Sequence, residues 1–422
     1  MSGWGGARRD VVPYTVPVAQ NAPLVLIRNA TLLAPKARGR CDILVGGTAV
    51  LAVAAPGAMT RADFNGHVTV DEVDVDGAWV TPGLVDAHVH VTGGGGEAGF
   101  SSRVPPRMLT ELTTAGVTSV VGVLGTDGRT RTMRSLIAAT YGLREVGLSA
   151  WCWTGSYEVP VRTLTGSVRD DVVFVDPVVG VGELAISDHR SSQPTMDELL
   201  RVAADVHVAG MIAGKAGVLH LHLGDGARGL SMVREALEGT EIPARVFHPT
   251  HVNRNPRLFA EALALADDPA TRGMTIDLTA FPADDLGDGL SAADGLAAVL
   301  KARGDCARVT VSSDGGGCMP HFDHEGHIVS YGVGQSATLL ETLRGCVQDH
   351  GLALEAVLPA FTSNVASLLR LKGKGEIVPG ADADLLVLND ALAPIHVMAN
   401  GRWMVRDGVP VTRGPFESSC AG

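Results

Sequence analysis

The sequence has little charge, and it is poorest in positive charge. Charged residues make up 19% of the 422 residues, and 46 Asp and Glu outnumber 34 Lys and Arg, so the formal net charge is −12. Proteins bind nucleic acids and anionic membrane surfaces through clusters of Lys and Arg, and this chain has no such cluster. The composition therefore predicts that neither nucleic acid nor a membrane is a partner.

Cysteine and long apolar runs are also scarce. The six cysteines are scattered without a CxxC pair, which argues against a disulfide framework and fits a reducing compartment. Residues 1–20 lack the apolar core of a signal peptide, and no apolar run reaches the roughly 18 residues of a membrane-spanning helix. We therefore expect a soluble protein of the cytoplasm.

Apolar residues and glycine, in contrast, are abundant. Apolar residues make up 45% of the chain, and 52 residues are glycine. A chain of this length and composition can bury a large core and fits two or three domains. Low charge together with many glycines is typical of α/β enzymes.

The two ends of the chain share one pattern. Short β-rich runs separated by Gly and Pro occupy residues 24–80, and the same pattern returns at residues 373–417. Two such segments around a long middle predict one discontinuous β domain, a small β-sandwich built from both chain ends. Residues 1–23 show no periodicity, and we interpret them as an extended arm.

Residues 81–372 alternate between apolar, strand-like runs and stretches with apolar residues at three- and four-residue spacing. The eight strand-like runs lie at 79–91, 117–125, 148–157, 178–187, 217–225, 244–252, 274–281 and 306–316. The clearest helical patterns lie at 132–147, 195–214, 230–239, 256–268 and 292–304. Eight βα units of this size predict a (β/α)8 TIM-type barrel, because a doubly wound sheet rarely needs eight.

Residues that can bind a metal end several of these runs. His88 and His90 close the first run, where alternation along a strand directs both imidazoles to one face. His222, His251 and Asp314 end the fifth, sixth and eighth runs. Because the catalytic groups of a barrel gather at the carboxyl ends of its strands, four imidazoles and a carboxylate there predict a divalent-metal site.

Other histidines near these positions have different expected roles. His220 lies one layer deeper than His222, and His248 precedes His251 by three residues, so we interpret both as packed or supporting residues rather than ligands. Three histidines follow Asp314 in a polar loop, where solvated side chains are the simplest interpretation and a lid over the site is the alternative: His321, His324 and His327.

With these residues in place, the chain resembles the amidohydrolase superfamily and, within it, the isoaspartyl (β-aspartyl) dipeptidases. The most specific stretches are GGGGEAG, TGSY, SDHRS and THVNRN, whereas the HVH pair and the closing PGADADLLV are more general. The resemblance extends from Leu24 to Glu417. It implies hydrolysis of dipeptides in which aspartate is linked through its side-chain carboxyl, with two bridged divalent metal ions, usually zinc.

The resemblance also implies a ligand set. His88, His90 and Asp314 would hold one metal ion, and His222 and His251 would hold the other. Water shared by two cations becomes acidic enough to supply hydroxide near neutral pH. Asp314 is then expected to accept a proton as general base and to deliver one to the leaving amine.

Substrate contacts follow from the same resemblance. Tyr157 in TGSY is expected to stabilise the oxyanion, and Glu97 in GGGGEAG to receive the α-ammonium group. Arg190 and Arg254 are expected to bind carboxylate, and Thr126 is assigned to the substrate site as well. The ordinary interpretation of Glu97 is a helix-start residue, and that of the two arginines is a pair of surface ion pairs.

Two positions depart from the family pattern. A lysine that carbon dioxide converts into a bridging carbamate is replaced here by Glu183. We therefore expect no carbamylated lysine. The charge is kept but the reach is shorter by roughly 3–4 Å, so either the metal ions lie closer to this strand or Glu183 binds only one. Cys318 replaces a substrate-holding serine, and a thiol is the poorer hydrogen-bond donor.

Three functions are compatible with the sequence. The first is a metal-dependent peptidase acting on isoaspartyl or closely related amide bonds. The second is a relative that cleaves another N-acyl amino acid or a cyclic amide, an alternative that Cys318 supports. The third is a catalytically inactive scaffold, which the complete ligand set makes the weakest. The family resemblance suggests a homo-oligomer. Cys318 as a metal ligand is a minor alternative.

Overall fold

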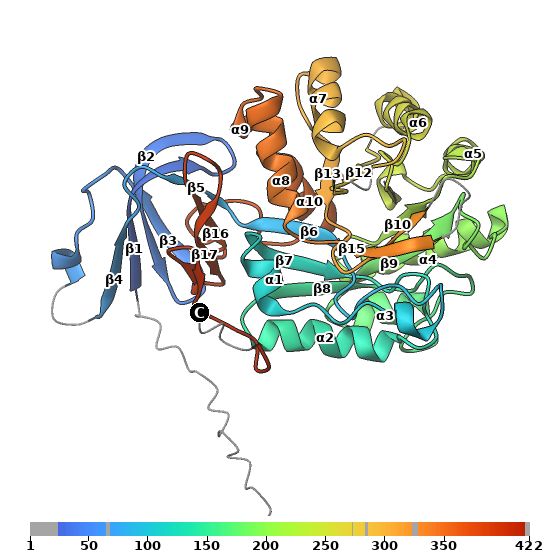
Figure 1. Cartoon of the computed structure of the whole chain (residues 1–422), viewed down its shortest axis with the longest axis horizontal. Coiled ribbons are helices and arrows are strands. Elements are labelled where there is room, and N and C mark those ends of the chain that lie inside the picture. Colours follow the sequence, from blue (N-terminus) through green and yellow to red (C-terminus); the bar gives the residue numbers. More distant parts are fainter. Residues whose placement is uncertain (1–23, 65–67, 272, 283–285, 323–327, 418–422) are drawn as a thin grey trace, which may run out of the picture.

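The computed structural model describes residues 24–64, 68–271, 273–282, 286–322 and 328–417. The arm expected at residues 1–23 and two of the loop histidines, His324 and His327, lie outside these ranges. Figure 1 shows a strand-rich part on the left and a mixed α/β part on the right.

Strands from both chain ends form one nine-stranded sheet in the strand-rich part. The strand order is β19-β18-β17-β16-β5-β1-β2-β3, and β4 pairs with β1 off this path. The strands are β1 (Leu24–Leu33), β2 (Ala37–Gly46), β3 (Ala49–Ala54), β4 (Val70–Asp74), β5 (Trp79–Pro82), β16 (Leu385–Leu388), β17 (Pro394–Ala399), β18 (Arg402–Arg406) and β19 (Val409–Pro410). β5 and β16 join the two ends through antiparallel pairing that sets Leu385 opposite Pro82.

Each of the eight strand-like runs of the middle region contains a β-strand. These strands are β6 (Leu84–Val89), β7 (Val117–Gly122), β8 (Ser149–Thr154), β9 (Val178–Ile186), β10 (Val218–Leu223), β11 (Phe247–Thr250), β12 (Ile276–Thr279) and β13 (Val309–Ser312). The first six form a parallel sheet in the order β11-β10-β9-β8-β7-β6, and β12 pairs with β13. A single parallel bridge joins Val89, the last residue of β6, to Gly315, which follows β13. The architecture is therefore mixed α/β.

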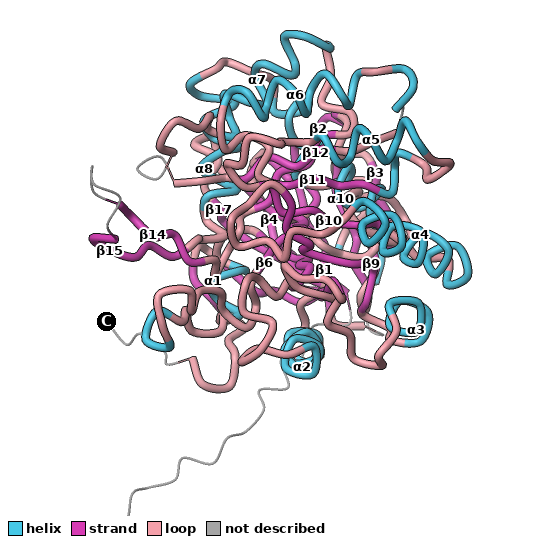
Figure 2. Tube along the Cα trace, turned by 90° about the vertical axis from the view of Figure 1, so that its right-hand side faces the viewer, coloured by secondary structure: helices cyan, strands magenta, loops and turns pink. Residues whose placement is uncertain are grey.

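Helices surround these strands, as Figure 2 shows. Five match the helical patterns of the sequence: α2 (Met133–Glu145), α4 (Met196–Ala213), α5 (Ser231–Gly239), α6 (Pro256–Asp267) and α7 (Ala292–Arg303). The others are α1 (Leu109–Thr113), α3 (Val168–Phe174), α8 (Thr338–Arg344), α9 (Leu354–Val357) and α10 (Ser363–Leu369). Short 3₁₀ turns lie at Arg61–Phe64, Phe100–Ser102, Ala244–Val246, Pro269–Thr271 and Leu358–Phe361, and a π-helical turn lies at Gly345–Asp349.

The helix limits follow from local sequence. In α4 the hydroxyl of Thr195 accepts from the backbone of Glu198, whose carboxylate accepts from Thr195 in return, and Gly214 ends the helix in the left-handed conformation. In α6, Asn255 caps the first turn and Pro256 occupies the first helical position. Among the helices of the described residues, none is both long enough and apolar enough to span a bilayer.

The polar loop expected after Asp314 is in part a β-hairpin. β14 (Cys318–Phe322) pairs antiparallel with β15 (Ile328–Val333), and Figure 2 shows this hairpin projecting from the body of the molecule. His321 belongs to β14, so its assignment to a loop was wrong. Pairing with a second short strand supplies the backbone hydrogen bonds that this segment would otherwise make to water.

The glycine-rich segment after His90 makes a tight loop. Gly93 and Gly95 adopt φ angles of 76° and 74°, and a Cβ atom on them would lie 1.9 and 2.4 Å from the carbonyl oxygens of Val104 and Ser102. Only glycine fits such positions. The guanidinium of Arg131 is buried against the same loop and donates to the carbonyls of Gly95 and Val104. Backbone sterics and one buried cation thus fix the loop that carries Glu97.

A buried lysine connects the two parts of the molecule. The ammonium of Lys374 lies 2.7 Å from Asp384 Oδ2, 2.9 Å from Asp382 Oδ2, 2.7 Å from Ser149 Oγ and 3.1 Å from Asn400 Oδ1. Ser149 begins β8, whereas Asp384 immediately precedes β16 of the shared sheet. One side chain of 6% exposure thus joins the carboxyl-terminal strands to the parallel sheet.

We expect Lys374→Met to destabilise the protein by about 3–5 kcal/mol, because the buried carboxylate of Asp384 loses its counter-charge. Lys372→Met is the matched control, since Lys372 lies two residues away and is exposed. Chemical denaturation of both variants and the parent protein measures the difference. Equal stabilities of the two variants would contradict this role for Lys374.

Candidate metal centre and active site

The six residues expected to bind metal lie together at the carboxyl ends of the parallel strands. His88 is in β6, Glu183 in β9 and His222 in β10. The other three follow the ends of β6, β11 and β13, and they are His90, His251 and Asp314. All are buried except Asp314, whose side chain is partly exposed.

Glu183 occupies the middle of this cluster. Its Oε1 lies 3.4 Å from His88 Nε2 and 3.6 Å from His90 Nε2. Its Oε2 lies 3.0 Å from His222 Nδ1 and 3.7 Å from His251 Nε2. One carboxylate therefore faces both histidine pairs, and the shorter reach of glutamate does not keep it from either pair.

Asp314 closes the cluster on the solvent side. Its Oδ1 lies 3.0 Å from His90 Nε2 and 3.5 Å from His88 Nε2. Three sets have ligand atoms within 4.8 Å of one another, namely His88, His90 and Glu183; His88, His251 and Asp314; and Glu183, His222 and His251. The second set combines residues from both expected metal sites, so the two sites adjoin one another.

Several atoms of the cluster fit a bound cation. His88 Nε2, Glu183 Oε1 and Asp314 Oδ1 are buried and have no hydrogen-bond partner within the described part of the chain. Buried polar atoms without partners are rare in folded proteins because each one costs free energy. Imidazole nitrogens and carboxylate oxygens are the ligands that zinc and similar divalent cations take. The residues present therefore fit a metal centre.

Charge holds the cluster in its ionised form. Burial by itself would raise the pKa of Glu183, but the charge of His88 and hydrogen bonds from His222 and His251 hold it well below its usual range. Burial would lower the pKa of His88, yet the charge of Glu183 outweighs it and raises the pKa to about 9. Burial likewise opposes ionisation of Asp314, and His90 and His88 keep its pKa below the ordinary value.

Two of these residues have an unusual backbone conformation. His251 and Asp314 adopt φ angles of 60° and 53°, in the left-handed region. Such conformations cost about 1–3 kcal/mol each and cluster at functional sites. The surrounding structure therefore holds both side chains at the strand ends against a local preference.

Tyr157 lies beside the cluster. Its hydroxyl is 2.8 Å from His222 Nδ1, and its ring packs against that imidazole with centroids 4.4 Å apart. Burial and the negative charge of Glu183 raise its pKa well above the ordinary value. Tyr157 thus keeps its proton near neutral pH and can donate a hydrogen bond to an oxyanion.

Sequence reasoning missed Asp188. Its carboxylate accepts from His222 Nε2 at 3.0 Å and from Arg190 Nε and Nη2 at 3.0 and 2.8 Å. The buried carboxylate thereby orients a candidate metal ligand and a candidate substrate-binding residue together. The signal was present in the stretch SDHR, where an acidic residue precedes Arg190 by two positions.

A cavity of about 1190 Å³ opens above the cluster. Its lining includes nine of the residues singled out from the sequence, namely His90, Glu97, Thr126, Tyr157, Arg190, His222, Arg254, Asp314 and Cys318. Glu97 Oε1 lies 3.7 Å from Arg190 Nη1, so the two expected substrate contacts are neighbours. His88, Glu183 and His251 lie deeper. The structure therefore brings the whole expected set to one cavity and its floor.

Three residues that line the cavity are Thr126, Arg254 and Cys318. Arg254 lies with its guanidinium 5.9 Å from the centre of the Phe281 ring and 3.7 Å from the exposed carboxylate of Asp225. Arg254 Nε and Thr126 Oγ1 are buried without a hydrogen-bond partner among the described residues. Burial raises the pKa of Cys318, so its thiol stays protonated.

The remaining histidines lie outside the metal sets. His220 and His248 belong to none of the three sets, in agreement with the expectation that they support rather than bind. His189 is exposed and its ring faces Asp188 at 3.6 Å.

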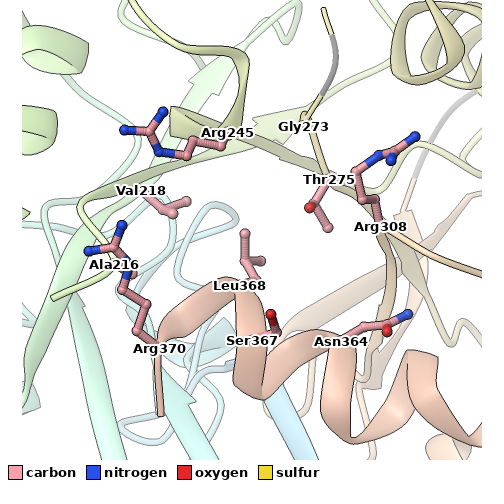
Figure 3. Close-up of a pocket in the computed structure, with 10 residues that line it drawn as sticks. All are labelled: Ala216, Val218, Arg245, Gly273, Thr275, Arg308, Asn364, Ser367, Leu368 and Arg370. Atoms are coloured by element: carbon pink, nitrogen blue, oxygen red, sulfur yellow. The ribbon is translucent and has the colours of Figure 1, made fainter. Parts of the chain in front are cut away.

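A second cavity, of about 260 Å³, lies at the opposite ends of the same strands (Figure 3). Val218, Thr275 and Arg308 line it, and they stand at the amino-terminal ends of β10, β12 and β13. Arg245 and Arg370 also line it, and none of its lining residues is His, Cys, Asp or Glu. The candidate active site is therefore the cavity at the carboxyl ends.

This chain is similar to several proteins of known structure. A β-aspartyl dipeptidase from Fervidobacterium islandicum AW-1, solved in complex with β-Asp-Leu dipeptide, is 39% identical, with a TM-score of 0.83 over 92% of this chain and 98% of that one. A dihydropyrimidinase from Brevibacillus agri shares the fold, with a TM-score of 0.64 at 15% identity.

Curated relatives are more distant. An adenine deaminase 2 from Rhizobium etli is 27% identical over 376 residues, which cover 87% of this chain and 54% of that protein. This chain thus spans about half the length of the curated relatives that it matches. The model of the amidohydrolase family matches residues 79–404. That match begins in β5 and ends in β18, so it contains all six candidate ligands and the strands that position them. Because the family model matches this long part of the chain, the chain belongs to the amidohydrolase family.

Proposed function

We propose that this protein is a metal-dependent dipeptidase that hydrolyses β-aspartyl dipeptides. The observation that carries the proposal is the carboxylate of Glu183 between two histidine pairs, on the floor of a cavity whose wall holds Glu97, Arg190 and Arg254. The substrate class is supported by the 39% identity to a β-aspartyl dipeptidase over nearly the whole chain.

The ligand assignment divides the cluster into two sites that share one carboxylate. His88, His90 and Asp314 would hold one cation, His222 and His251 the other, and Glu183 would contact both. Two divalent cations, zinc in our proposal, would supply Lewis acidity and lower the pKa of water. Glu183 carries a negative charge between the two sites, which would partly neutralise two cations bound there.

Asp314 would carry out the proton transfers, and Tyr157 would donate a hydrogen bond. Asp314 stands at the edge of the cluster toward the cavity, where it can accept a proton from attacking water and return one to the leaving amine. Tyr157 keeps its proton and can donate a hydrogen bond to the oxygen that becomes negative in the transition state.

Three charged side chains suit the two ends of a dipeptide. Glu97 would bind the α-ammonium group, and Arg190 and Arg254 would bind carboxylate through charge-assisted hydrogen bonds. Arg190 is already oriented by Asp188, whereas the unpartnered Nε of Arg254 has a donor to spare. The unpartnered hydroxyl of Thr126 offers a further substrate contact.

A second candidate function is hydrolysis of another N-acyl amino acid or of a cyclic amide, and Cys318 is the observation that favours it. Its thiol lines the cavity where the family places a serine hydroxyl. A panel of β-aspartyl dipeptides, N-acyl amino acids and cyclic amides, assayed on one preparation, distinguishes the two functions. Our proposal requires the β-aspartyl dipeptides to be the best substrates.

Further parts of the proposal concern the whole molecule. We propose that β6 to β13 form a closed (β/α)8 barrel, supported by the bridge from Val89 to Gly315 and by the surrounding helices. Residues 24–80 and 373–417 would form the β domain and 81–372 the barrel. We also propose a homo-oligomer in the cytoplasm, which rests on the family resemblance and the cysteine pattern.

Removal of metal should abolish hydrolysis. We expect the purified protein to contain up to two divalent cations per chain, and a chelator should take both metal and activity away. Added Zn²⁺ should restore both, because the folded cluster supplies the ligands. Elemental analysis alongside the assay checks this, and full activity in a metal-free preparation would refute it.

Glu183→Gln should bind the second cation weakly and lose more than about 100-fold in kcat, because the amide keeps the shape but leaves two cations less neutralised. Glu235→Gln is the control, since Glu235 is exposed on α5. Activity restored to metal-free parent protein should be independent of bicarbonate, because a carboxylate needs no carbon dioxide. Two bound metal ions and near-normal turnover in Glu183→Gln would show that another group bridges.

Arg254→Gln should raise KM by roughly 10- to 100-fold for a β-aspartyl dipeptide, because one charge-assisted hydrogen bond is lost. The corresponding dipeptide amide, which lacks the terminal carboxylate, should be affected little. Arg201→Gln, at an exposed position of α4, controls for the change in net charge. An equal effect on both substrates would show that Arg254 does not bind the terminal carboxylate, since the amide keeps the α-carboxylate of its aspartyl residue.

A further inference from the structure

A continuous chain of hydrogen bonds runs from His88, one of the six candidate metal ligands, into the interior. His88 Nδ1 lies 2.8 Å from His220 Nε2, and His220 Nδ1 lies 2.9 Å from His248 Nδ1. His248 Nε2 lies 3.0 Å from Thr310 Oγ1, which donates to Asp277 Oδ1 at 2.5 Å. We call these residues below His88 the buried relay: His220, His248, Thr310 and Asp277.

The donors and acceptors of the relay can be assigned in only one consistent way. Asp277 as a carboxylate only accepts, so the single proton of Thr310 points to it and the oxygen of Thr310 accepts from His248 Nε2. A neutral His248 then offers a lone pair at Nδ1, which accepts from His220 Nδ1. His220 Nε2 in turn accepts from His88 Nδ1. In the neutral imidazole that binds a cation, the lone pair of His88 is therefore at Nε2.

An independent contact supports this direction. His220 Nδ1 also lies 3.2 Å from the backbone carbonyl of His248, which cannot donate. The proton must therefore be on His220 Nδ1 and not on its Nε2. Both lines of reasoning place the lone pair of a neutral His88 at Nε2, the atom that faces Glu183 and Asp314 at 3.4 and 3.5 Å.

The relay is rigid as well as directed. All four of its members and His88 are completely buried. Trp153 stacks on His220 with ring planes 13° apart, and His220 stacks on His248 with centroids 4.8 Å apart. The other oxygen of Asp277 accepts from Thr250 at 2.6 Å and from Ser312 at 2.5 Å, which leaves Asp277 no freedom to turn.

We propose that Asp277, acting through Thr310, His248 and His220, fixes the tautomer and orientation of His88 so that Nε2 is available to a cation. This proposal deepens the proposed metal site and rests on it. The members of the relay are positioning residues. Asp188 and Thr279 contact the distal nitrogens of His222 and His251 directly, at 3.0 and 2.7 Å, so the relay gives His88 the same support over a longer distance.

The tautomers can be measured without any substitution. In protein labelled with ¹⁵N-histidine, long-range proton–nitrogen spectra distinguish a protonated from an unprotonated ring nitrogen, and His220→Gln and His248→Gln identify the signals. We expect the Nδ1–H form at His220 and the Nε2–H form at His248, with or without Zn²⁺. The opposite form at either residue would overturn the proposal.

Thr310→Val tests the function of the relay, because it removes the hydroxyl and keeps the shape. We expect the affinity for Zn²⁺ to fall roughly 10- to 100-fold, with loss of the single tautomer at His248. Thr310→Ser should restore both. Thr118→Val is the matched control, since Thr118 is also completely buried but its hydroxyl has no partner among the described residues.

The readouts separate this proposal from the proposed function. Unchanged Zn²⁺ affinity and an unchanged tautomer in Thr310→Val would overturn the relay, even if the enzyme acts on β-aspartyl dipeptides. Failure of the parent protein to bind Zn²⁺ would overturn the metal site and the role of the relay toward it, while the tautomers of the metal-free protein would still report on its direction.

Discussion

The buried carboxylate of Glu183 is the constraint on which the rest of the site depends. A lone negative charge in a dry interior is costly, and burial opposes its ionisation. It persists because His88, His90, His222 and His251 surround it, each with a nitrogen within 3.7 Å of one of its oxygens. The strands that carry these residues are thereby fixed relative to one another at their carboxyl ends.

The need of buried polar groups for partners extends into the interior below the candidate metal ligands. In a (β/α)8 barrel, the architecture that we propose, the inside is usually filled by layers of branched apolar side chains. Here one layer is polar, with His220, His248, Thr310 and Asp277 hydrogen-bonded to one another. Such a layer is stable only when every member has its partner. The same hydrogen bonds that satisfy the layer also decide which nitrogen of His88 faces the cluster.

Two buried cations stabilise other parts of the structure. Arg131 holds the glycine-rich loop that presents Glu97, and Lys374 joins the shared sheet to β8. Both side chains are buried, and both bind groups from segments far apart in the sequence. The scarcity of charge in the composition thus does not make charge unimportant, because buried charges hold the loop and the sheet in place.

The sequence by itself determined the elements and the residue types of the site. Period-2 and period-3.6 patterns located the eight strands β6 to β13 and five helices of the mixed α/β part, because those patterns reflect which face of an element is buried. Strand-end positions identified His88, His90, His222, His251 and Asp314. The hairpin of β14 and β15 was missed, since its pairing joins segments whose separate patterns are weak.

Only the tertiary structure decided how these residues are connected. Glu183 lies between both histidine pairs, Asp188 joins His222 to Arg190, and Asp277 reaches His88 through three intervening side chains. Such contacts join strands that are separated by up to about two hundred residues of sequence, so no local pattern contains them. The sequence fixes what each strand end can bind, whereas distances and hydrogen-bond directions exist only once the strands are packed side by side.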